Sequence, residues 1–505
     1  MSAVESLAGE TPAATEGGDR TRWIALYVLC IGMLMIVLDA TIVNVALPSI
    51  QSDLGFSQSD LAWVVNAYLI PFGGLLLLAG RLGDLISRRG VFLTGLGVFV
   101  AASLVCALAQ SQEVLIAARF VQGAGGALTS AVILGMIVTM FPEPREQAKA
   151  IGVYSFVASA GASIGLLLGG VLTEAINWHW IFFVNLPIGI ATALLALRLI
   201  RRDRGIGFGH GADVLGAALV TGSLMLLVYT IVEAAEVGWG SAQTLGFGAA
   251  ALVLGAAFIA RESTAANPLI PLRIFRERNV SGANLIQMLM VAGMFGMFFL
   301  GSLYMERVLG YDALQIGLAF LPVALLIGVL SLGFSANLNM RYGTRATLLP
   351  GLVLVAAGLV MFARVPVDAS YVTDLLPAMI LFGVGAGLSF PSLATLAMSS
   401  AGPANAGLAS GLVNTSLQVG GALGLAVLAT LSTTRTDTLL ASGESAASAL
   451  TDGYKLAFVI GAGLVVIAIG IAITVLRAEP PAGQEAEQEA KLDLRGAEPA
   501  YSEAA

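Results

Sequence analysis

Charged residues are scarce in this sequence, because Lys, Arg, Asp and Glu together make up 11% of its 505 residues. Soluble domains carry roughly 25%, and a soluble protein of this length needs a polar shell that so few charges cannot supply. Low hydrophobicity, the signature of disordered chains, is also missing, since 57% of the residues are hydrophobic. The composition therefore excludes both a soluble enzyme and a disordered chain.

Residues that bind metals or nucleotides are also rare. The chain has two histidines and two cysteines, and both cysteines, Cys30 and Cys106, fall inside apolar runs. It contains neither the G-x-x-x-x-G-K-[ST] phosphate loop nor the H-E-x-x-H zinc motif, and no basic tract suggests nucleic acid. We therefore expect no metal, no cofactor and no nucleic-acid partner, and no hydrolysis of ATP by this chain.

Long apolar runs are abundant, and a helix needs about 20 mostly apolar residues to span a membrane. A membrane barrel would instead show short alternating strands. We expect membrane-spanning helices near 23–47, 61–80, 91–109, 113–138, 150–173, 180–199, 212–234, 244–261, 281–305, 314–335, 346–363, 375–398, 407–431 and 455–476. The sequence thus predicts an all-α polytopic membrane protein with 14 transmembrane helices.

Basic residues concentrate in alternate loops of this topology. With a cytoplasmic N-terminus, all but five of the 25 Lys and Arg residues fall on the inner side. The exceptions are Arg119, Arg307, Arg364, Arg435 and Lys455. Because basic loops stay cytoplasmic, we expect both termini in the cytoplasm of a multi-pass protein of the cell membrane, with disordered tails at 1–22 and 477–505.

Glycines repeat between two distant apolar runs. The run 150–173 carries Gly152, Gly161 and Gly165, and the run 407–431 carries glycines with the same offsets, at 411, 420 and 424. Transporters are often built from such repeated halves. We expect a six-helix half at 23–199, an inserted helix pair at 200–261 and a second six-helix half at 262–476.

Several motifs resemble those of the major facilitator superfamily, in particular its fourteen-span drug:proton antiporters of the EmrB/QacA type. Leu38–Pro48 is similar to the first-helix signature of that branch. Gly80–Arg89 resembles the loop motif of the superfamily, and Arg119–Gly123 its arginine motif. Trp178–Gly189 and Pro268–Phe275 are similar to further sequence motifs of this branch. The resemblance implies the major facilitator fold, two six-helix halves plus the inserted pair.

An acidic residue lies deep in the first apolar run. Burying Asp39 at that depth costs about 2.5–3.5 kcal/mol on insertion scales, so it is a functional candidate. Arg119 enters its own run to a similar depth from the same side, so we expect the two side chains to be close. Coupling to protons is favoured, since the matching positions of the other half are uncharged, and a structural ion pair is the alternative. The residues expected to support the pair are Gln122, Gly123, Thr41 and Asn44.

Three further groups complete the candidate site. The resemblance implies a charge latch that holds the two halves together in one conformation. Its residues are Gly80, Asp84, Arg88 and Arg89. Small residues also line one face of the run 150–173, and we expect them to form either a sliding contact between the halves or static packing. These residues are Gly161, Gly165, Gly169 and Gly170. A substrate cavity is predicted to be lined by Asn284, Gln287, Met294, Phe298, Asn414 and Gln418.

The predicted function is proton-coupled efflux of hydrophobic drugs or antibiotics by alternating access, in a chain that acts as a monomer. Leu166 stands where the antiporter motif of the family has proline, which bears on the direction of transport. Export of an endogenous metabolite, amino acid or lipid is one alternative. A membrane sensor or enzyme with a transporter-like fold is another, from a different class.

Overall fold

The computed structural model describes residues 16–56, 61, 63–207, 213–265, 268, 272–311, 313–399 and 406–477. Across these ranges the chain forms helices joined by short turns, with no strand. Each predicted apolar run falls on a helix, which confirms the all-α prediction for the described part of the chain.

The predicted N-terminal half contains α1 Glu16–Leu54, α3 Trp63–Leu85, α4 Arg88–Ala107, α5 Gln112–Met140, α6 Pro144–Ala175, α7 Trp180–Phe183 and α8 Asn185–Leu199. The inserted pair contains α9 Val214–Val237 and α10 Ala242–Thr264. The C-terminal half contains η1 Leu272–Arg276, α11 Arg278–Arg307, α12 Ala313–Val329, η2 Leu330–Phe334, α13 Ser335–Tyr342, α14 Thr344–Phe362, η3 Tyr371–Leu375, α15 Leu376–Met398, α16 Ala406–Ala441 and α17 Ala446–Thr474.

Serine side chains cap the first turns of several of these helices. Ser87, Ser111, Ser241 and Ser445 each accept a hydrogen bond from a backbone N–H three residues later, at the starts of α4, α5, α10 and α17. Such caps satisfy amide donors that have no partner inside the helix. α1 begins at Glu16, so residues 16–22, predicted to belong to the tail, are helical.

Twelve helices in the described part of the chain are long and apolar enough to cross a membrane. The predicted count of fourteen spans is not confirmed by this criterion. The two predicted spans outside the twelve correspond to α6, which has 32 residues, and to α9, which contains a shorter apolar stretch, Leu215–Ile231.

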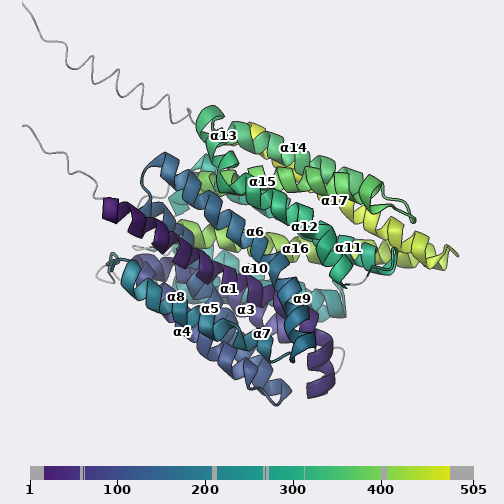
Figure 1. Cartoon of the computed structure of the whole chain (residues 1–505), viewed down its shortest axis with the longest axis horizontal. Helices are drawn as coiled ribbons and strands as arrows, with labels where there is room; N and C mark the ends of the chain where they lie inside the picture. The colour runs from purple at the N-terminus through teal and green to yellow at the C-terminus, as the bar shows by residue number, and fades with distance from the viewer. Residues whose placement is uncertain are drawn as a thin grey trace, which may run out of the picture.

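The helices form two groups that follow the order of the chain (Figure 1). α1, α3, α4, α5, α6 and α8 pack on one another, and α11, α12, α14, α15, α16 and α17 form the second group. The groups meet along two seams: α3 and α5 contact α16, and α6 contacts α12 and η2. Figure 1 shows α6 beside α12 along the boundary. The inserted helix α9 packs on both α3 and α16, so it covers the first seam.

Glycines let the backbones approach closely at both seams. A Cβ atom on Gly407 would lie 2.6 Å from the Gly80 carbonyl oxygen, and one on Gly135 would lie 2.7 Å from that of Ala406. On the second seam, a Cβ atom on Gly152 would overlap the carbonyl oxygen of Ser331. These contacts lie where α3 and α5 end and where α6 and α16 begin. We call this end, which carries Arg81, Arg88, Arg89 and Arg145, the arginine-rich end.

Candidate functional site

A buried ion pair joins α1 to α5. The Nη1 atom of Arg119 lies 2.6 Å from Oδ2 of Asp39, and both side chains are 0% exposed. Two charges without access to water are costly unless each is paired and hydrogen-bonded. The predicted proximity of Asp39 and Arg119 is therefore confirmed, and their burial places a full ionic interaction inside the N-terminal half.

Gln122 completes this pair, as its position one turn after Arg119 suggested. Its Oε1 atom accepts a hydrogen bond from Arg119 Nη1 at 2.8 Å, and its Nε2 atom donates to Asp39 Oδ1 at 2.7 Å. Both carboxylate oxygens of Asp39 are thus engaged. The same amide also donates to the hydroxyl of Ser103 on α4 at 3.2 Å.

Asn185, at the start of α8, is a fourth member that the sequence analysis missed. Its Nδ2 atom donates to Asp39 Oδ1 at 2.9 Å and to the Ser103 hydroxyl at 3.0 Å. That hydroxyl in turn donates to the carbonyl oxygen of Phe182. Asn185 lies within Trp178–Gly189, a motif that carried the family resemblance, and membership of that motif is the signal that could have identified it.

The remaining surface of the guanidinium packs on backbone and an aromatic ring. Arg119 Nε donates to the Val64 carbonyl oxygen at 3.0 Å, and its central carbon lies 4.4 Å from the centroid of the Tyr68 ring. A cation over a ring face is attracted by its quadrupole. Arg119 Nη2 and the Tyr68 hydroxyl have no hydrogen-bond partner among the described residues. Two buried polar groups of the site are therefore unpaired within the described part of the chain.

Two of the other predicted supporting residues, Gly123 and Thr41, lie where neighbouring helices approach each other closely. A Cβ atom on Gly123 would overlap the Tyr68 carbonyl oxygen, so this glycine allows α5 to approach α3. The Thr41 hydroxyl donates to the Val37 carbonyl oxygen at 2.9 Å and faces Gly165 of α6. The side chain of Asn44 lies outside the described residues.

Asp84, at the end of α3, binds across the first seam. Its Oδ1 and Oδ2 atoms accept hydrogen bonds from the backbone N–H groups of Gly407 and Leu408, at 2.9 and 2.8 Å. These amides lie at the N-terminus of α16, where the helix dipole favours an anion. Arg88 Nη2 donates to the same carboxylate at 2.7 Å. The carboxylate thus links the two halves at the arginine-rich end, and Gly80 gives it access by allowing α3 to approach α16.

Arg89 differs from the other predicted latch residues, since its Nη2 atom donates to the Leu197 carbonyl oxygen of α8 within its own half. The first turn of α4 is instead held by Asp203, which lies after the end of α8 and was not among the predicted site residues. Its carboxylate accepts hydrogen bonds from the Ser87 hydroxyl and from the backbone N–H groups of Arg88 and Arg89. Asp203 therefore caps the start of α4 from within the same half.

The predicted glycine stripe of α6 faces α1 and not the other half. Cβ atoms on Gly161 and Gly169 would meet Val37 and Ile42, and one on Gly165 would overlap the Thr41 hydroxyl. Gly170 is half-buried. This arrangement favours static packing inside the N-terminal half over a sliding contact between the halves.

Most of the residues predicted to line a substrate cavity take part in packing of the C-terminal half. The Asn284 Oδ1 atom accepts a hydrogen bond from the Ser416 hydroxyl at 2.9 Å, and Gln287 donates to the Val413 carbonyl oxygen at 3.3 Å, so both join α11 to α16. Asn414 donates to a carbonyl oxygen of its own helix.

The apolar members of that set also pack on their own half. Met294 is buried, and the Phe298 ring lies 5.2 and 5.9 Å from those of Phe320 and Phe382. Gln418 is half-buried. The described residues contain no group of three or more His, Cys, Asp and Glu side chains that could hold a metal ion.

Comparison with known proteins matches this architecture to one family. The profile of the Major Facilitator Superfamily matches residues 29–425. Two solved structures share the fold: the human organic anion transporter MFSD10, with a TM-score of 0.63 and 15% identity, and the proton:xylose symporter XylE, with 0.64 and 13%. Alignment with MFSD10 covers 89% of this chain and 99% of that one, and with XylE 91% and 97%.

Curated relatives are similar over almost the whole chain. The puromycin resistance protein of Streptomyces alboniger is 38% identical over 94% of this chain and 95% of its own length. The cephamycin export protein of Amycolatopsis lactamdurans is 38% identical over 94% and 98%. The tetracenomycin C resistance and export protein of Streptomyces glaucescens is 34% identical over 84% and 78%.

Proposed function

Since this chain belongs to the Major Facilitator Superfamily, a transporter family and not an enzyme family, we propose that it exports hydrophobic antibiotics or related drugs in exchange for protons. Relatives named for puromycin resistance and cephamycin export cover 94% of the chain. The observation that carries the proton-coupling part is the fully buried pair of Asp39 and Arg119.

The pair offers a chemical reason for coupling. In the described conformation, Arg119, Gln122 and Asn185 donate hydrogen bonds to the Asp39 carboxylate, and Arg119 also balances its charge. A movement that separates α1 from α5 leaves that carboxylate buried without its cation, and burial favours the neutral, protonated form. Proton uptake from outside and release inside would then alternate with this movement and drive substrate outward. The membrane potential adds about 2.3 kcal/mol per charge per 100 mV.

We place the arginine-rich end in the cytoplasm, because basic loops are retained there. The chain then spans the cell membrane fourteen times, with α6 and α9 as the two spans beyond the twelve apolar helices. Residues 23–199 and 262–476 form the moving halves, 200–261 the inserted pair, and the segments up to 22 and from 477 cytoplasmic tails. The protein works as a monomer without a bound cofactor.

The test compares Asp39→Asn with Asp53→Asn, a matched control on the same helix. The Asp53 carboxylate accepts a hydrogen bond from Trp178 Nε1, and Asp53 lies several turns after Asp39 on α1. The assay uses everted vesicles from an efflux-deficient bacterium, with labelled puromycin in the medium. A proton gradient is imposed across the vesicle membrane, and the uptake of puromycin is measured. We expect Asp39→Asn to abolish gradient-driven uptake, and Asp53→Asn to retain it.

Removing one partner of a buried pair costs about 3–5 kcal/mol, so folding is controlled separately. The charge-balanced double variant, Asp39→Asn with Arg119→Gln, leaves no unpaired charge. We expect it to keep substrate counterflow in the absence of a gradient and to lose proton-driven uptake. Gradient-driven uptake that persists in Asp39→Asn would refute the assignment of Asp39.

A further inference from the structure

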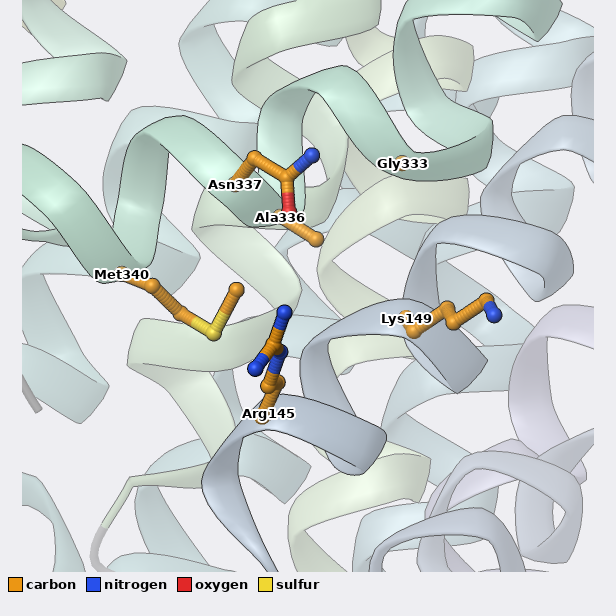
Figure 2. A pocket seen from close by; sticks show the side chains of 6 residues that line it. All are labelled: Arg145, Lys149, Gly333, Ala336, Asn337 and Met340. Atoms are coloured by element: carbon orange, nitrogen blue, oxygen red, sulfur yellow. The ribbon is translucent and has the colours of Figure 1, made fainter.

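A cavity of about 210 Å³ lies between α6 and α13 at the arginine-rich end. Figure 2 shows the residues that line it, which are Arg145, Lys149, Gly333, Ala336, Asn337 and Met340. Since one water molecule takes about 30 Å³ of liquid volume, the cavity has room for a group of several heavy atoms together with its hydration. It is separate from the Asp39–Arg119 pair and from the Asp84 latch.

The charge of the cavity is positive. Arg145 and Lys149 come from the first turns of α6, and neither has an ion-pair partner among the described residues. The nearby acid Glu146 pairs instead with Arg22 at 3.3 Å. Figure 2 shows the Arg145 guanidinium pointing toward Ala336 and Met340, whereas Lys149 extends along α6, with its ammonium 5.2 Å from the ring centroid of Trp23. The guanidinium donors of Arg145 are therefore available to an anion.

The two walls of the cavity belong to different halves of the protein. Arg145 and Lys149 stand on α6, while Asn337 and Met340 stand on α13, beyond the π-helical segment η2. The halves touch beside the cavity, where Gly152 meets the Ser331 carbonyl oxygen. Asn337 lines the opposite wall of the same cavity, and Figure 2 shows its amide oxygen on the side of Arg145. Its NH₂ group can donate a second hydrogen bond to an anion on Arg145 once the amide turns over.

We propose that this cavity binds a phosphate group, carried by an anionic phospholipid or free in the cytoplasm, and that the bound group holds α6 against α13. A guanidinium presents paired donors that match phosphate oxygens, and basic pockets between helices at the cytoplasmic face bind anionic lipid headgroups. The apolar side chains of Ala336 and Met340 suit the glycerol portion of a lipid. Because the ligand touches both halves, it stabilises the conformation in which the arginine-rich end is closed.

The experiment measures thermal unfolding of the full-length protein in nanodiscs, without substrate or proton gradient. It is therefore independent of the proposed proton coupling. One arm raises the fraction of phosphatidylglycerol in phosphatidylcholine, and a second adds inorganic phosphate to pure phosphatidylcholine. We expect a saturable rise of the unfolding midpoint in at least one arm. A rise only with phosphatidylglycerol identifies the lipid headgroup as the ligand, and a rise with phosphate identifies the free anion.

Variants assign that rise to the cavity. Arg145→Gln should weaken the apparent affinity roughly five-fold, which corresponds to about 1 kcal/mol, and addition of Lys149→Gln should weaken it further. The matched control is Arg341→Gln, which removes the same charge from α13 but does not line the cavity. The proposal is overturned if neither ligand stabilises the native protein. It is also overturned if Arg341→Gln weakens the effect as much as Arg145→Gln, since the effect would then be general surface attraction.

Discussion

Replacing Asp84 with Asn should open the seam between α3 and α16. The carboxylate accepts two backbone N–H groups from the first turn of α16, and it is only 3% exposed. An amide side chain offers one oxygen, so at least one of these bonds is lost, together with the attraction between the charge and the helix dipole. A hydrogen bond to a charged group contributes about 1.5–3 kcal/mol. The equilibrium between the closed and open arginine-rich ends should therefore shift roughly 10- to 150-fold toward the open state.

The shift is measured as a distance between spin labels placed on the two halves at that end, by double electron–electron resonance in liposomes. Asp203→Asn serves as the matched control. Asp203 also accepts hydrogen bonds from backbone N–H groups at a helix start, but its partners Ser87, Arg88 and Arg89 lie at the start of α4, inside one half. We expect Asp84→Asn to populate a longer distance and Asp203→Asn to leave the distribution unchanged. An unchanged distribution in Asp84→Asn, or an equal change in both variants, would refute the latch.

Two further predictions concern the N-terminal half. Asn185→Leu should slow gradient-driven uptake about ten-fold or more while counterflow persists, because Asp39 loses a hydrogen-bond donor worth about 1.5–3 kcal/mol; equal losses in both assays would contradict a role in coupling. Gly165→Ala should lower the unfolding midpoint, because the new methyl group meets the Thr41 hydroxyl and overpacking costs about 1–3 kcal/mol. Adding Thr41→Ala should recover part of that loss, and no recovery would mean that the backbone of α1 is the obstacle.

The charged part of the site could be predicted from the sequence, whereas its uncharged part could not. A carboxylate and a guanidinium inside apolar runs are so costly that Asp39 and Arg119 are conspicuous, and similar depths suggested their contact. Asn185 and Ser103 lie in apolar runs too, but a neutral polar side chain there is too common to mark a position. Only the packing of α8 on both α1 and α4 brings Asn185 to the Asp39 carboxylate and to the Ser103 hydroxyl.

Spacing along a helix predicted a face but not its partner. Gly161, Gly165 and Gly169 share one face of α6, as expected, but the helix they contact is α1. Which helices pack together depends on the packing of the whole bundle and not on one helix alone. The same holds for Asp203, which follows α8 in the sequence and caps α4, more than 100 residues earlier. Long-range contacts of this kind leave no local pattern in a single sequence.

The two seams between the halves differ in chemistry, and this difference bears on how they open. The seam of α3 and α16 is closed by Asp84 and covered by α9, so opening it separates a carboxylate from a helix N-terminus. The seam of α6 and α12 is closed by backbone contact at Gly152 and leaves beside it a cavity with the cation Arg145. The first seam carries its own anion, whereas the second can recruit one from the membrane or the cytoplasm. Ionic conditions and lipid composition should therefore act on the second seam, and substitutions of Asp84 on the first.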